Sequence, residues 1–174
     1  MILSDDSASA EDWYQAGMNM LRSENSSGEE AEACFDRALA VDPQCAGALI
    51  LKASFAIQHR RFEDALVFCD RVQALDPATI HSFNRPLVAS VWRNKALALH
   101  GLGRIEEEIA FYETVLAGHP PVAEQAELWG LKGAALLSSG KHTEALLCIE
   151  TSKGLGCPRA AEILRLLHDH ARKN

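Results

Sequence analysis

One spacing recurs four times along the chain: a large apolar residue is followed, four positions later, by a residue with a small side chain. The four pairs are Trp13 with Gly17, Leu49 with Ala53, Trp92 with Ala96, and Trp129 with Gly133. Their leading residues are 36, 43 and 37 positions apart. Because one pattern returns at nearly constant intervals, the chain is expected to build the same supersecondary unit four times.

Each window continues in the same way after the first pair. A second small residue follows in three of the windows, at Ala31, Ala65 and Ala145, whereas the third window has Glu108 at this position. A bulkier residue comes four positions later, and these are Phe35, Cys69, Tyr112 and Ile149. The exception predicts either looser packing around Glu108 or a carboxylate turned toward solvent.

The apolar residues within a window recur at helical spacing in two runs, separated by short polar or glycine-containing turns such as "GLGR" and "SSGK". Each window is therefore predicted to form a helical hairpin. Two antiparallel helices joined by a tight turn approach closely only where their side chains are short, which explains the small residues. Prolines at the window ends stop the second helix, and they are Pro43, Pro77, Pro120 and Pro158.

The Trp, the small residue after it, the later Ala and Phe, and the final Pro resemble the tetratricopeptide repeat, a helix-turn-helix unit of about 34 residues. The resemblance implies an all-α fold, a right-handed α-solenoid of four hairpins with a C-terminal capping helix. The four repeats are expected at residues 11–45, 46–79, 87–122 and 126–158. Residues 1–10 are expected to be a flexible N-terminal segment, and residues 159–174 a capping helix with a basic tail.

Two segments allow alternatives. The insertion "ATIHSFNRP", residues 78–86, is either a longer loop ended by Pro86 in the first turn of a helix or a lid over the groove. The last segment either caps the final hairpin or forms a dimerising helix. The sequence does not decide the oligomeric state.

Composition and charge exclude several classes of function. The net charge is −7, which argues against nucleic-acid binding because this requires a basic surface to neutralise phosphates. No apolar run is long enough to span a bilayer, and the acidic start does not resemble a secretory signal, so a cytoplasmic location is expected. The five cysteines follow no metal-binding or disulfide pattern and are expected to be reduced and mostly buried. No nucleotide, metal or nucleophile motif occurs, so neither a cofactor nor a catalytic role is predicted.

In proteins of this family the first helix of each repeat lines a concave surface that binds peptides. The resemblance therefore implies a groove formed by the inward positions of these helices. They are Tyr14, Met18, Arg22, Ile50, Ser54, Ile57, Arg93, Asn94, Leu97, Ala134 and Leu137, with Glu127 and Gly130 on the fourth copy. Arg93 and Asn94 are the candidates for holding an acidic group or a peptide backbone of the ligand. The residues that grip carboxylates in one well-known version of the family are absent from the matching positions.

These observations predict a non-catalytic protein-interaction module, an adaptor or assembly scaffold, which binds a peptide or an amphipathic helix of a protein partner. The alternative is a dedicated chaperone that resembles the class II chaperones of type III secretion, which are also acidic and built from such repeats. The sequence leaves open whether the groove or the convex face binds the partner.

Overall fold

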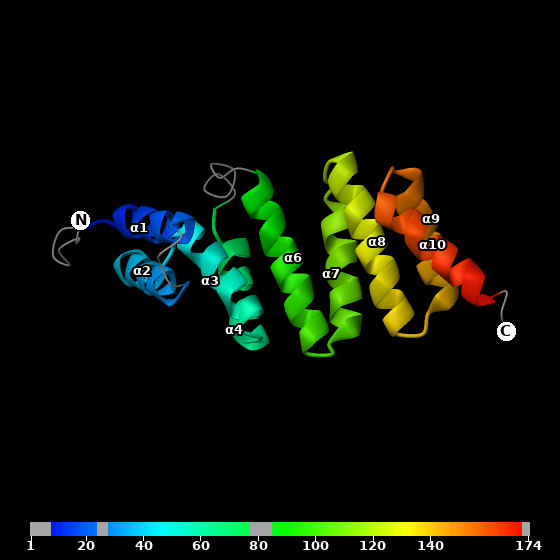
Figure 1. Cartoon of the computed structure of the whole chain (residues 1–174), viewed down its shortest axis with the longest axis horizontal. Helices are drawn as coiled ribbons and strands as arrows, with labels where there is room; N and C mark the ends of the chain where they lie inside the picture. The colour runs from blue at the N-terminus through cyan, green and yellow to red at the C-terminus, as the bar shows by residue number, and fades with distance from the viewer. Residues whose placement is uncertain (1–7, 24–27, 77–84, 172–174) are drawn as a thin grey trace. The chain divides into compact units, whose positions relative to one another are not determined.

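The computed structural model describes residues 8–23, 28–76 and 85–171 of the chain. Throughout these ranges the regular elements are α-helices, with no β-strand among them (Figure 1). The all-α class predicted from the sequence is therefore confirmed. Residues 1–7 of the expected flexible segment and residues 78–84 of the expected loop or lid lie outside the described ranges.

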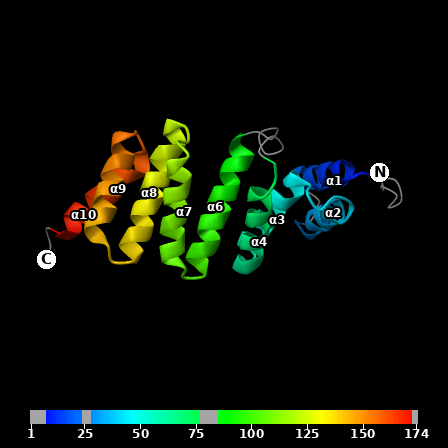
Figure 2. The same cartoon turned by 180° about the vertical axis from the view of Figure 1, so that it is seen from behind.

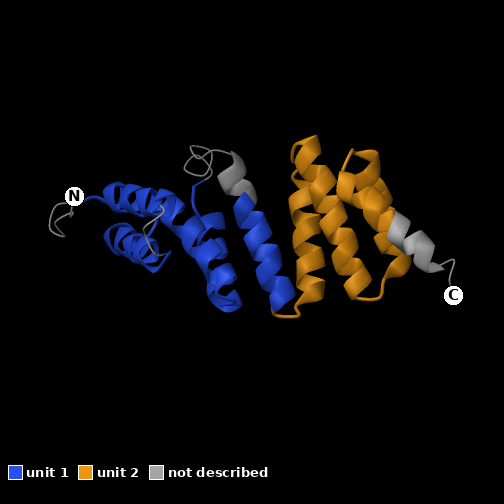
Figure 3. Ribbon diagram, viewed as in Figure 1, with its two compact units in different colours: residues 1–101 blue, residues 102–174 orange. Residues whose placement is uncertain are grey.

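The helices form two compact units, residues 1–101 and 102–174 (Figure 3). Those of unit 1 are α1 (Ala10–Arg22), α2 (Gly28–Val41), α3 (Ala46–Gln58), α4 (Phe62–Gln73) and α6 (Arg85–Gly101). Those of unit 2 are α7 (Ile105–Ala117), α8 (Val122–Ser138), α9 (His142–Gly154) and α10 (Pro158–Ala171). The third predicted repeat contributes α6 to unit 1 and α7 to unit 2.

Antiparallel pairs are the main packing unit on either side of this division. In unit 1, α1 packs against α2 and α3 against α4, while α6 contacts both α3 and α4 (Figures 1 and 2). In unit 2, α8 packs against both α7 and α9, and α10 packs against α9. The helical hairpins expected from the repeated windows are therefore present as α1/α2, α3/α4 and α8/α9.

The small residues lie where the paired helices cross. A methyl group added to Gly17 would lie 2.5 Å from Cε1 of Phe35, and one added to Gly133 would lie 2.5 Å from Cγ1 of Ile149. Both partners are the bulkier residues of their own windows, and both are fully buried. The register read from the sequence thus brings each glycine to the side chain that requires its lack of a Cβ.

Glu108 does not turn toward solvent, contrary to one of the two expectations. It is 5% exposed, and its Oε1 accepts a hydrogen bond of 3.1 Å from the hydroxyl of Tyr112 on the next turn of α7. A buried carboxylate requires such a partner because burial removes its hydration. Burial, followed by the charge of Glu108, raises the pKa of Tyr112 above its ordinary value.

Three times along the chain, a lysine on the first helix of one repeat pairs with an acid on the second helix of the repeat before it. Lys52 contacts Asp36 at 2.7 Å, Lys95 contacts Asp70 at 2.6 Å, and Lys132 contacts Glu113 at 2.8 Å. Every lysine directly precedes the small residue of its window, and every acid directly follows the bulkier residue of the preceding window. These repeat-linking pairs join α2 to α3, α4 to α6 and α7 to α8.

The five cysteines are free thiols, as expected: Cys34, Cys69 and Cys148 are buried, and Cys45 and Cys157 are half-buried. Burial raises the pKa of the Cys69 thiol to about 12. Because the thiolate is the reactive form, Cys69 is protected from modification in the folded chain.

The turn between α3 and α4 contains a strained residue. Arg60 has a φ of 57° and stands where the equivalent turn between α8 and α9 has Gly140, with a φ of 77°. In both turns the amide after this residue donates to a carbonyl in the last turn of the helix, from Arg61 to Ala56 and from Lys141 to Leu136. A side chain in this left-handed conformation costs about 1–2 kcal/mol.

Replacing Arg60 with Gly is therefore expected to stabilise unit 1. The gain is about 0.5 kcal/mol, because glycine's greater loss of freedom on folding offsets part of the relieved strain. Urea unfolding followed by circular dichroism measures the change. Gly140→Ala is the reverse control. It should destabilise the chain, since it introduces the same strain at the matching position. A lower midpoint for Arg60→Gly would contradict this account of the turn.

Candidate functional site

The predicted groove residues of unit 1 divide by their exposure. Arg22, Arg93 and Leu97 are exposed, and Leu97 is 45% exposed although its side chain is apolar. The half-buried members are Tyr14, Met18, Ser54 and Ile57. Ile50 and Asn94 are buried, with exposed fractions of 1% and 7%. The structure thus leaves seven of the nine within reach of solvent.

Ile50 packs in the core of unit 1 with Leu49 and Ala53 of its own helix and Val91 of α6. A residue with so little exposed surface does not contact a partner unless the helices separate. Ile50 is buried because α6 packs against α3 and covers the side of α3 that carries it. Ile50 therefore has no part in the function proposed below.

Asn94 and Ser54 bond to each other and do not point into free space. The Nδ2 of Asn94 donates to the Oγ of Ser54 at 2.8 Å, and the Ser54 hydroxyl donates to the carbonyl of Ile50 at 3.1 Å. This chain of bonds joins α6 to α3 and satisfies a buried amide. Of the two residues expected to hold a ligand's polar group, Arg93 is exposed and Asn94 has a structural partner.

Tyr14 forms a fixed part of the surface of α1. Its ring lies against α3, where a methyl group added to Gly47 would be 2.6 Å from Cε2, and its centre is 6.2 Å from that of Phe35. Burial, followed by the charges of Glu11 and Cys45, raises the pKa of the Tyr14 hydroxyl. The neutral ring therefore offers an apolar edge with one polar tip beside the half-buried Met18.

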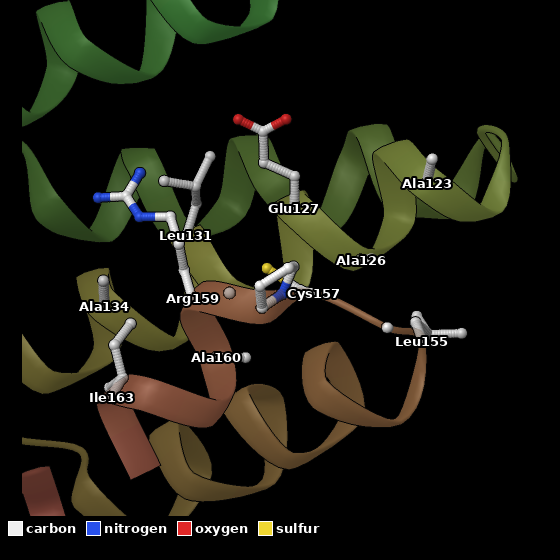
Figure 4. Close-up of a pocket in the computed structure, with 13 residues that line it drawn as sticks. Ala123, Ala126, Glu127, Leu131, Ala134, Leu155, Cys157, Arg159, Ala160 and Ile163 are labelled. Atoms are coloured by element: carbon white, nitrogen blue, oxygen red, sulfur yellow. The ribbon is translucent and has the colours of Figure 1, made fainter. Parts of the chain in front are cut away.

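Unit 2 contains a pocket of about 490 Å³ between α8 and the start of α10 (Figure 4). We call it the α8–α10 pocket. The α8 wall consists of Ala123, Ala126, Glu127, Gly130, Leu131 and Ala134. The opposite wall consists of Leu155, Gly156, Cys157, Pro158, Arg159, Ala160 and Ile163. A volume of this size falls within the range of about 300–1,000 Å³ typical of ligand sites, and the lining is mostly apolar as in such sites.

Two short contacts hold α8 against α9 beneath the pocket. The buried hydroxyl of Ser152 donates to the carbonyl of Ala126 at 2.5 Å. At Gly130 an added methyl group would lie 3.0 Å from the same hydroxyl oxygen, so the close approach depends on glycine. The α8 wall is thereby fixed relative to the end of α9.

A tight turn then directs the chain into the second wall. Gly156 has a φ of 92°, a left-handed conformation that glycine adopts without strain. The amide of Cys157 donates to the carbonyl of Ser152 at 3.1 Å, which closes the end of α9. Pro158 begins α10 immediately afterwards, where its fixed φ suits the first turn of a helix. The pocket wall is therefore built by backbone geometry and does not rely on long side chains.

Two oppositely charged side chains flank the pocket, one on each wall. Glu127 of α8 and Arg159 of α10 are both exposed, and in Figure 4 both extend toward the top of the view. Among the side chains that the structure describes, neither Glu127 nor Arg159 forms a hydrogen bond or ion pair with another residue. Both charges are therefore available to a ligand.

The sequence predicted a groove along the first helices of the repeats, and some of its residues lie in one wall of this pocket. Ala134, Glu127 and Gly130 are inward positions of the fourth copy, and all three line the pocket. Leu137, the other predicted residue of α8, instead packs against the cluster formed by Ile149, Ala160 and Leu164. The second wall spans the end of the predicted fourth repeat, residues 155–158, and the start of the predicted cap, Arg159, Ala160 and Ile163. None of these residues was predicted to bind a ligand, although the glycines and the proline of "GLGCP", residues 154–158, indicate a tight turn there.

Among the described residues, no group of three or more His, Cys, Asp or Glu side chains is placed to hold a metal ion. In that same part of the chain no helix is long and apolar enough to cross a membrane.

Known structures resemble this fold at low sequence identity. Residues 41 to the end of MamA from Desulfovibrio magneticus RS-1 align with a TM-score of 0.67 and 16% identity, covering 95% of this chain and 96% of that one. A structure of MamA from AMB-1 aligns with a TM-score of 0.68 and 18% identity, covering 88% and 76%. A tetratricopeptide repeat protein from Parabacteroides merdae ATCC 43184 aligns with a TM-score of 0.57 and 18% identity, covering 90% and 57%. These similarities support the fold alone.

Sequence comparison gives the family. No curated protein matches this chain. The model of the tetratricopeptide repeat family matches residues 21–79 and 78–123, which together make up more than half of the sequence. With the repeated windows and the paired helices, this match shows that the chain belongs to the tetratricopeptide repeat family.

Proposed function

We propose that the chain is a non-catalytic scaffold for protein–protein interaction that binds a peptide segment or an amphipathic helix of a partner on the first helices of its hairpins. The family to which it belongs is in general a protein-interaction fold. Catalysis would require converging polar groups, and the α8–α10 pocket is mostly apolar. The cytoplasmic location remains a prediction from the sequence.

The observation that carries the proposal is the α8–α10 pocket. It opens on α8, the first helix of the fourth hairpin, and its lining includes the predicted groove residue Ala134. An apolar hollow with a few polar groups at its edge suits a protruding apolar side chain of a partner. On unit 1, Leu97 of α6 is exposed, and Tyr14 and Met18 of α1 are half-buried, so apolar side chains of both helices reach the solvent. No observation favours the secretion-chaperone alternative over the general scaffold.

Replacing Ala134 with Phe is expected to weaken peptide binding about tenfold or more, because the new ring fills the pocket. Ala134 is exposed, so this ring does not disturb the core. The probe is a set of short peptides selected from a phage-displayed random library on the full chain, then synthesised with a fluorescent label. Fluorescence anisotropy measures their Kd for each variant.

Ala110→Phe provides the matched control for this test. Ala110 is an exposed alanine of α7 in the same unit and does not line the pocket. The control variant should bind the selected peptides with unchanged Kd. Equal binding by Ala134→Phe would instead move the site to unit 1 or to the second helices of the hairpins.

A further inference from the structure

We propose that the α8–α10 pocket recognises an uncharged, extended peptide segment with one large apolar side chain, and that Glu127 and Arg159 hold the backbone amide and carbonyl groups of that segment. This inference rests on the proposed function and specifies the chemistry of the partner. It assigns the C-terminal helix a role in recognition in addition to its role as a cap.

The shape of the pocket favours an extended peptide over a compact molecule. Its lining runs along α8 from Ala123 to Ala134, and at about 1.5 Å per residue this stretch of helix is about 16 Å long. An extended chain rises about 3.3 Å per residue, so about five residues of a partner match this length. The alanines and the glycine of the α8 wall let such a strand approach the helix closely.

The charges at the edge favour a segment without net charge. A charged group of the ligand is attracted to a nearby side chain of opposite charge, but a side chain of the same charge at a similar distance cancels most of this attraction. Glu127 and Arg159 supply one charge of each sign on the two walls. An anionic segment attracted by Arg159 is therefore repelled by Glu127, and the reverse holds for a cationic one.

An uncharged peptide backbone, in contrast, complements both charges at once. Every residue except proline carries one N–H donor and one C=O acceptor. The carboxylate of Glu127 accepts from an N–H, and the guanidinium of Arg159 donates to a C=O; hydrogen bonds to charged groups are stronger than those between neutral groups. Because the two groups lie on different helices, they also fix the direction of the bound segment.

The test reverses one charge at a time and repeats the peptide selection on the full chain. Arg159→Glu gives two acids at the pocket and should select peptides with Lys or Arg, while Glu127→Lys should select peptides with Asp or Glu. Both variants should bind the uncharged peptides selected by the unaltered chain about tenfold more weakly. The double variant Glu127→Arg with Arg159→Glu should again select uncharged peptides.

Controls separate loss of recognition from loss of structure. Glu162 is an exposed acid of α10 that does not line the pocket, so Glu162→Lys should leave the selection unchanged. Circular dichroism should give the same helical content for all variants, and the milder Glu127→Gln and Arg159→Gln should show the same weakening if a reversal impairs folding.

The possible failures are distinguishable. If Ala134→Phe abolishes binding but the charge variants still select uncharged peptides with unchanged Kd, the proposed function survives and the present inference does not. Peptides from the unaltered chain that carry a charge beside their apolar residue would overturn the inference in the same way. If no peptide is selected and an apolar dye such as anilinonaphthalene sulfonate occupies the pocket, both proposals fail in favour of a small-molecule site.

Discussion

A leucine in place of Gly133 is expected to lower the free energy of unfolding of unit 2 by about 3 kcal/mol. A single methyl group at this position would already lie 2.5 Å from Cγ1 of Ile149 and 3.2 Å from the carbonyl oxygen of Ala145. One neighbour is a fully buried side chain and the other is backbone, so neither moves without separating α8 from α9. Thermal unfolding followed by circular dichroism measures the effect as a fall of more than 10 °C in Tm.

Gly154→Leu is the matched control for this substitution. Gly154 ends α9, and a methyl group added there meets no atom of the described chain within 4 Å. The same change from glycine to leucine should therefore leave Tm unchanged or raise it slightly, since leucine is the better helix former. Equal effects at the two positions would refute the close helix crossing at Gly133.

The second large effect is expected at Lys52, the buried cation of unit 1. Lys52 is 6% exposed, and its ammonium group contacts Glu32 at 2.8 Å and Asp36 at 2.7 Å. Replacing Lys52 with Met removes the cation but keeps the apolar stem, so Glu32 retains only Arg61, at 2.6 Å. Breaking a buried pair by removing one partner costs about 3–5 kcal/mol, and the remaining arginine reduces this to about 2 kcal/mol. Urea unfolding measures the loss.

The pH dependence of stability provides an independent measurement of the same cluster. Burial raises the pKa of Glu32, but the hydrogen bonds from Lys52 and Arg61 outweigh it, so the pKa in the folded chain lies below the ordinary value of 4.5. A depressed pKa means that the carboxylate stabilises the fold above pH 4.5 and that this contribution is lost as pH falls through the lower, folded value. The stability of the unaltered chain should therefore exceed that of Glu32→Gln at neutral pH, and the difference should narrow in acid.

Lys95→Met is the control for Lys52→Met. Lys95 makes the equivalent contact with Asp70, which is 61% exposed, and pairs with an exposed partner contribute at most about 1 kcal/mol. A loss at Lys95 as large as that at Lys52 would show that burial does not decide the strength of these pairs.

The fold could be predicted from the sequence because the positions that define it interact locally or at a fixed register. Gly17 meets Phe35 and Gly133 meets Ile149, as the four windows require, and these contacts depend only on hairpin geometry. The family resemblance follows from the same residues, and the match to the family model confirms it.

The candidate site could be predicted only in part, because burial depends on neighbours that periodicity does not place. Ile50 and Leu97 both follow from the inward register, yet α6 covers Ile50 while Leu97 stays exposed. Glu108 was ambiguous because its burial depends on the hydroxyl of Tyr112. The second wall of the pocket depends on the left-handed turn at Gly156, which leads into the start of α10 opposite α8 and has no periodic signal.

The repeat-linking pairs bear on what happens when one hairpin of the chain is duplicated. The second hairpin carries a residue of each kind, Lys52 on α3 and Asp70 on α4. A copy of this hairpin inserted directly after the original would therefore form the same lysine–aspartate contact at the new junction. The first hairpin has Ala16 at the lysine position, so it cannot form this contact with a helix before it. A duplicated second hairpin would therefore keep this contact at both of its junctions, whereas a hairpin placed before the first one would lack it.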